Sequence, residues 1–184
     1  MAIAYAQTGD HEAALRAGAV ALGLYEAAGA GLEAGSLRNS LALTYLQVGN
    51  VARAADMASE ARVSVSRLGD RRLLAHVAET QAQIALAQDD EASVIGFANE
   101  ALDLARSTEN ANAEAAALLT LARLHRQRGR TAESESTYRD AAELLRRVGP
   151  RQRLTEVLHD WADLLVSEHR HEDAVPLLQE ALRR

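Results

Sequence analysis

The sequence contains no cysteine and no lysine, and it has two prolines and 3% aromatic residues among its 184 positions. Without cysteine it cannot form disulfides, thiolate metal sites or cysteine nucleophiles. No stretch of membrane-spanning length is free of charge, and residues 1–10 lack the basic and apolar regions of a signal peptide. We therefore expect a cytoplasmic protein that does not enter a membrane.

The residues present favour helix packed against helix. Hydrophobic residues make up 48% and charged residues 25% of the chain, which is a balance that folds. Because alanine is abundant and aromatics are few, apolar surface has to be buried by close approach of backbones. The formal net charge of −6 argues against binding to a phosphate backbone, which requires a positive surface.

One unit repeats along the chain with a period of about 40 residues. Turn positions recur at Gly9, Gly49, Asp89, Gly129 and His169, and again at Gly29, Gly69, Glu109 and Gly149, with Pro150 after the last. Alanine recurs without exception in two series, Ala2, Ala42, Ala82, Ala122 and Ala162, and Ala21, Ala61, Ala101, Ala141 and Ala181. A small residue on each helix lets two backbones come close where the helices cross.

The recurring turn positions predict ten helices with approximate boundaries: 1–8, 11–28, 33–48, 51–67, 72–88, 91–107, 112–128, 131–147, 152–168 and 172–183. Asp10, Asn50 and Asp90 stand at helix starts, where their side chains can accept from free backbone amides. In the fourth unit Arg130 occupies that position, and Thr131 is the expected cap.

The pattern resembles the tetratricopeptide repeat, which pairs large and small residues around a turn glycine. The second unit supplies Leu41, Ala42, Tyr45, Gly49, Ala54, Ala58 and Ala61, and the fifth supplies Leu158, Ala162, Leu165, Ala174, Leu178 and Ala181. The usual repeat has about 34 residues and HEAT or armadillo units about 40–47, so length alone would favour the latter. The turn glycine flanked by alanines favours the tetratricopeptide repeat, in the longer variant found in bacterial regulators and kinesin light chains.

The resemblance implies an all-α, right-handed superhelical solenoid of about four and a half helix pairs in one domain. The expected units are residues 1–29, 30–69, 70–109, 110–149 and 150–184. The first unit lacks most of its first helix, and no polar capping helix follows the fifth. We therefore expect a fragment of a larger protein or an end that associates with a second copy.

The resemblance also implies a concave groove lined by the first helix of each unit. By phase, the residues facing it are Asn39, Leu43, Leu46 and Gln47 in the second unit, His76, Glu79, Gln83 and Leu86 in the third, Leu119, Arg123, Arg126 and Gln127 in the fourth, and Glu156, His159, Asp163 and Val166 in the fifth.

Within this set, leucines such as Leu119 are the expected apolar contacts, amides suit the backbone of an extended peptide, and Arg123 with Arg126 could hold an acidic group. The alternative is that the polar members are simply solvated. The lysine and paired asparagines with which some relatives bind a C-terminal carboxylate are missing, and only Asn39 fits that pattern.

Other chemistry has weaker support. The arginine-rich stretches 123–130 and 146–153 lie at opposite ends of one helix pair, about 24 Å apart for a helix of sixteen residues, so they form no single nucleic-acid patch. Glu156 with His159, and His169 with His171, are too few ligands for a metal site. We expect no cofactor and no catalysis, because phosphate-binding loops and nucleophile motifs are missing.

Two functions follow as hypotheses. The first is an interaction module that binds a peptide or helix of a partner protein in the groove. The second is the effector-sensing and dimerisation part of a bacterial transcriptional regulator whose DNA-binding domain lies outside this chain.

Overall fold

The structure is a computed structural model that describes residues 11–183, and every regular element within that range is an α-helix. The helices are α2 (His11–Ala27), α3 (Gly31–Gln47), α4 (Val51–Leu68), α5 (Arg71–Ala87), α6 (Glu91–Ser107), α7 (Ala111–Gln127), α8 (Thr131–Val148), α9 (Arg151–Ser167) and α10 (His171–Leu182). The nine predicted helices in this range are confirmed to within two residues at each end. The predicted helix 1–8 lies outside the described residues.

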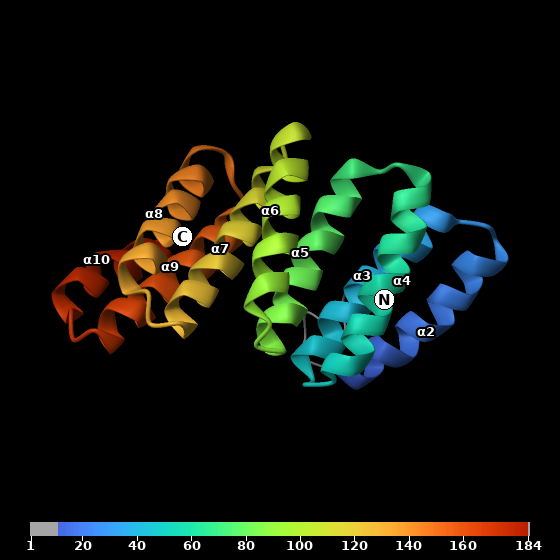
Figure 1. Cartoon of the computed structure of the whole chain (residues 1–184), viewed down its shortest axis with the longest axis horizontal. Helices are drawn as coiled ribbons and strands as arrows, with labels where there is room; N and C mark the ends of the chain where they lie inside the picture. Colours follow the sequence, from blue (N-terminus) through green and yellow to red (C-terminus); the bar gives the residue numbers. More distant parts are fainter. Residues whose placement is uncertain (1–10, 184) are drawn as a thin grey trace.

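Consecutive helices pack as antiparallel pairs that follow one another along the molecule, from α2 at one end to α10 at the other (Figure 1). Each of α3, α5 and α7 also packs against the next odd-numbered helix, whereas the described even-numbered helices do not pack against one another in this way and are joined instead by long side chains. The odd-numbered helices therefore form a continuous inner wall. This is the all-α solenoid expected from the repeat.

The turns adopt the left-handed conformation that the recurring turn residues predict. Gly29, Gly49, Gly69 and Gly129 have φ between 68° and 78°, and Asp89, Glu109 and His169 stand in the same conformation without being glycine. A positive φ strains a residue that carries a Cβ, so glycine suits these positions. Gly149 is the exception at φ −95°, because the following Pro150 keeps it extended.

Side-chain caps fix several helix starts. Asn50 and Asp90 accept from the backbone amides of Arg53 and Ser93, at 3.2 and 3.1 Å, which confirms both predicted caps. Thr131 does not cap α8: the helix begins at Thr131 itself, and its hydroxyl donates to Glu168 instead. Asp70 and Asn110 are further caps on the inner-wall helices α5 and α7, and the predicted cap Asp10 lies outside the described residues.

The alanine series marks the places where helices cross. Ala42, Ala82, Ala122 and Ala162 are at most 1% exposed, and Ala61, Ala101 and Ala141 are fully buried, which confirms the predicted close approach. Ala21 and Ala181, on the first and last described helices, are half-buried. Ala2 lies outside the described residues.

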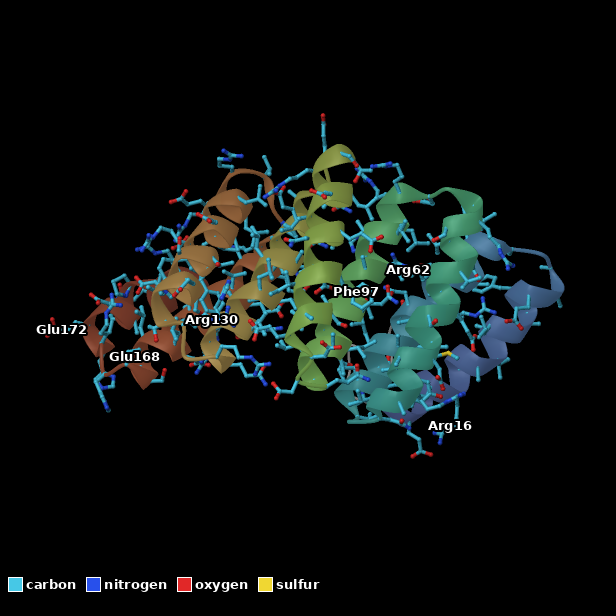
Figure 2. All side chains as sticks on the ribbon, viewed as in Figure 1. Arg16, Arg62, Phe97, Arg130, Glu168 and Glu172 are labelled. Atoms are coloured by element: carbon cyan, nitrogen blue, oxygen red, sulfur yellow. The ribbon has the colours of Figure 1, made fainter. Side chains whose placement is uncertain are left out.

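Arginine side chains join successive units. Arg62 on α4 binds both carboxylate oxygens of Glu100 on α6, at 2.6 and 2.7 Å, and lies over the ring of Phe97 (Figure 2). From the turn before α8, Arg128 and Arg130 both reach Glu91 at the start of α6, and their hydrogen bonds lower the pKa of that carboxyl. These arginines from one of the basic stretches therefore contact neighbouring carboxylates.

Candidate partner-binding groove

One hollow of about 670 Å³ lies on the inner wall, at the C-terminal ends of α3, α5 and α7. We call it the central hollow, and its lining is Leu46, Gln83, Leu86, Ala87, Arg123, Arg126 and Gln127. Six of these seven residues belong to the set expected from the repeat phase, and Ala87 is the addition. Three successive units contribute, because their parallel first helices end side by side.

The lining offers an apolar side and a polar side. Leu46 on α3 and Leu86 on α5 are half-buried and expose part of their side chains. Gln127 and Arg126, in the last turn of α7, are exposed to solvent. The hollow therefore combines leucines with amide and guanidinium donors, which is the combination that an extended peptide requires.

Arg123 is already engaged within the protein. Its Nε donates to Asp160 Oδ2 at 2.6 Å and its terminal nitrogen donates to Glu156 Oε1 at 3.0 Å, both on α9. Glu156 also accepts from Arg153 at 2.6 Å. The expectation that Arg123 and Arg126 together hold an acidic ligand is corrected accordingly, because Arg123 holds α9 against α7.

Glu79 is buried in the inner wall rather than facing a partner. It is 6% exposed, and its Oε1 accepts from Gln83 at 2.6 Å and from Thr120 on α7 at 3.1 Å. Burial raises the pKa of Glu79, and the two hydrogen bonds only partly oppose that effect. This carboxyl therefore joins α5 to α7 and cannot contact a ligand in this structure.

His76, one turn before Glu79 on α5, is also held within the wall. Burial lowers its pKa, and the charges of Arg153 and Arg72 lower it further, so the neutral ring is favoured. Asn110 Nδ2 can then donate to His76 Nε2 at 3.1 Å, while Asn110 Oδ1 caps α7 by accepting from Ala113. An asparagine, which offers both a donor and an acceptor, serves both contacts.

The other predicted groove residues fall into three groups. Leu119 is 1% exposed inside the core, which removes it as an apolar contact for a partner, and Asn39 is 8% exposed. Leu43 is half-buried on α3, outside the central hollow. Gln47, His159, Asp163 and Val166 are exposed on the same wall but do not line the central hollow.

A second hollow was missed at the sequence level. It measures about 330 Å³ and lies at the N-terminal halves of α3 and α5, with Leu32, Leu37 and Leu73 among its lining residues. Leu32 is 40% exposed, and this apolar residue next to the turn at Gly29 was the available signal.

Within residues 11–183, neither Glu156 with His159 nor His169 with His171 belongs to a group of three side chains that could hold a metal ion. The rings of His169 and His171 lie edge to face with centroids 6.3 Å apart, at the turn between α9 and α10. None of the helices in the same range has the length and apolar character needed to cross a bilayer.

The chain is similar to known helical-repeat proteins in both sequence and structure. Residues 113–184 match the tetratricopeptide repeat family model. The chain resembles the crystal structure of a Rap protein complexed with Competence and Sporulation Factor, with a TM-score of 0.89 and 16% identity over 98% of this chain and 51% of that one. This chain thus spans about half the length of that relative. No curated protein matches the sequence.

Two further structures share the fold at lower similarity. A putative kinesin light chain from Podospora anserina with TPR-like repeats has a TM-score of 0.67 and 13% identity, over 98% of this chain and 89% of that one. BtubC from P. vanneervenii has a TM-score of 0.64 and 15% identity, over 97% of this chain and 82% of that one. The molecule is a helical-repeat solenoid. Residues 113–184 are similar to the tetratricopeptide repeat, and the remaining described helices continue the same solenoid.

Proposed function

We propose that this protein is an interaction module that binds an extended segment of a partner protein across the central hollow. One observation carries the proposal: three successive units bring leucine side chains, amides and two arginines to one open hollow of about 670 Å³ on the inner wall. Tetratricopeptide repeat domains generally serve protein–protein interaction. The Rap relative, which was solved in complex with Competence and Sporulation Factor, supports ligand binding by this fold.

The test fills the hollow without touching the core. Ala87 is exposed and lines the hollow, so Ala87→Trp places an indole where the segment would lie. Ala92→Trp, on an exposed position of α6 outside the hollow, is the matched control. We expect immobilised wild-type protein to retain hexapeptides from an amidated library in which particular amino acids are enriched at particular positions. Ala87→Trp should abolish the enrichment and Ala92→Trp should retain it; equal behaviour of the two variants would refute the proposal.

The second candidate is the effector-sensing and dimerisation part of a bacterial transcriptional regulator. It is favoured by exposed apolar side chains on α10, where Val175, Leu178 and Leu182 are 49%, 36% and 76% exposed. The Rap relative, twice as long as this chain, shows the same fold as part of a larger protein. Sedimentation would test self-association: a dimer that Leu178→Glu with Leu182→Glu dissociates supports this candidate, and a monomer at all concentrations contradicts it. A helix-turn-helix domain encoded in the same reading frame would assign the DNA-binding part.

A further inference from the structure

The central hollow carries one positive charge that no carboxylate in the described part of the chain neutralises. Two charged residues line it, and both are arginines. Arg123 is paired with Asp160 and Glu156, whereas no carboxylate of residues 11–183 lies within ion-pair distance of Arg126. An exposed guanidinium beside half-buried leucines is suited to a ligand group that brings the missing negative charge.

We propose, on the basis of the proposed groove function, that the central hollow selects a segment carrying an acidic side chain, which Arg126 binds. An apolar side chain of the same segment lies against Leu46 on α3 and Leu86 on the intervening α5. The occupant is thus an extended stretch with one hydrophobic and one acidic residue at a fixed separation.

Helix spacing sets that separation. Packed helices lie about 8–10 Å apart, so α3 and α7, with α5 between them, have axes about 16–20 Å apart. The side chains of Leu46 and Arg126 both reach inward and shorten this distance. At about 3.3 Å per extended residue, three or four positions should separate the apolar residue from the acidic one. Gln127 beside Arg126 offers an amide to the intervening backbone.

A side-chain carboxylate fits this hollow better than the carboxylate at a chain end. A terminal carboxylate is held by several converging donors, and here one guanidinium, that of Arg126, has no carboxylate partner within residues 11–183. The opposing explanation is that Arg126 only complements the carbonyl end of α7, where cations are favoured. The control has to reproduce that feature.

Arg147 provides the control. It is exposed in the last turn of α8, it has no ion-pair partner among residues 11–183, and it does not line the hollow. Arg126→Glu and Arg147→Glu each change the net charge by the same amount at the same kind of helix end. The two variants therefore differ only in whether the charge faces the hollow.

The probe is a set of amidated hexapeptide mixtures, each with one fixed residue at one position, bound to the immobilised full chain. We expect wild type and Arg147→Glu to enrich Asp and Glu over Lys and Arg by about tenfold at one position, the scale of one charge-assisted hydrogen bond. Leucine-like residues should be enriched three or four positions away. Arg126→Glu should reverse the charge preference while keeping the apolar one.

Three outcomes would overturn the inference. Enrichment without charge preference, or an acidic preference that survives Arg126→Glu, would refute the acidic ligand while leaving peptide binding intact. A preference that appears only for peptides with a free C-terminal carboxylate would assign Arg126 to a chain end instead. Absence of enrichment at every position would contradict the proposed function itself.

Discussion

The N-terminal and C-terminal halves of the solenoid have hydrophobic cores of different composition. The helices α7 to α10 share one continuous core that contains Tyr138, Leu158 and Trp161. Helices α2 to α6 contribute mainly to several smaller clusters, in which alanine is the commonest buried residue and aliphatic side chains such as Leu41 and Met57 fill the rest. Equivalent helix pairs therefore reach the same fold by different packing.

Equivalent positions show how the packing changes along the chain. At one phase of the second helix the residue is small in the first three units and large in the last two: Gly18, Ala58, Ala98, Tyr138 and Leu178. Where the residue is small, backbones approach closely; where it is large, a side chain fills the space between helices. The family model matches residues 113–184, the part in which the large residues stand. The comparison teaches that the fold tolerates both solutions, although only one carries the recognisable pattern.

The largest expected effect is at Tyr138, which is fully buried in the C-terminal core. Tyr138→Ala should lower the free energy of unfolding by about 3–5 kcal/mol, the scale of aromatic truncation in a core. Leu178→Ala, at the equivalent but exposed position on α10, should lower it by less than about 1 kcal/mol. Denaturant unfolding measures both. Equal losses would show that α10 is covered in solution.

The reverse substitution tests the N-terminal half. Ala58 is 1% exposed and contacts its neighbours closely, so Ala58→Leu should cost about 1–3 kcal/mol by overpacking. Ala52→Leu, on an exposed position of the same helix, is the control and should cost little. The two variants are compared by thermal and denaturant unfolding. A neutral Ala58→Leu would mean that the N-terminal helices have room for side chains, and that close backbone packing does not hold them together.

Most of the fold could be predicted from the sequence because its signals are local and repeated. Alanine at every crossing and glycine in the turns fixed the helices to within two residues. The cap of α8 was misassigned to Thr131, because a threonine next to a helix start has the right chemistry whether or not the helix begins one residue earlier. Periodicity does not resolve that shift.

The site was less predictable, because phase places a residue on a wall but does not say how deep it lies. Positions 39, 79, 119 and 159 share one phase, yet Asn39, Glu79 and Leu119 are buried while His159 is exposed. The depth depends on the neighbouring unit, since α7 covers Glu79 through Thr120. The pairing of Arg123 with Asp160 likewise depends on the contact between α7 and α9, which no local pattern reports.

Glu79 also distinguishes the two halves, since the equivalent residue in the C-terminal core is the apolar Leu119. Because burial raises the pKa of Glu79 above its unfolded value, folding takes up a proton in the window between the two values. Wild-type stability should therefore fall as pH rises through the raised pKa. Glu79→Gln keeps an oxygen acceptor for Thr120 and cannot ionise.

The comparison of Glu79→Gln with wild type is made by urea unfolding at several pH values. We expect the variant to be the more stable protein at pH 8, and the difference should shrink toward pH 4.5, below which the wild-type carboxyl is protonated in both states. Glu133→Gln, on an exposed position of α8, controls for loss of one negative charge. A difference that stays constant with pH would show that Glu79 is not the titrating group.

The smallest expected change in the free energy of unfolding concerns the glycines inside the N-terminal helices. A Cβ added to Gly23 would meet no atom within 4 Å, so Gly23→Ala should raise the free energy of unfolding by about 0.5–1 kcal/mol through helix propensity. A Cβ on Gly35 would lie 2.8 Å from Val65 Cγ2, and buried Val65 is stiff about χ1. Gly35→Ala should therefore lower stability despite the same gain in propensity. If calorimetry shows that both variants are stabilised, α3 and α4 can move apart, and the close backbone approach is not what fixes the N-terminal units.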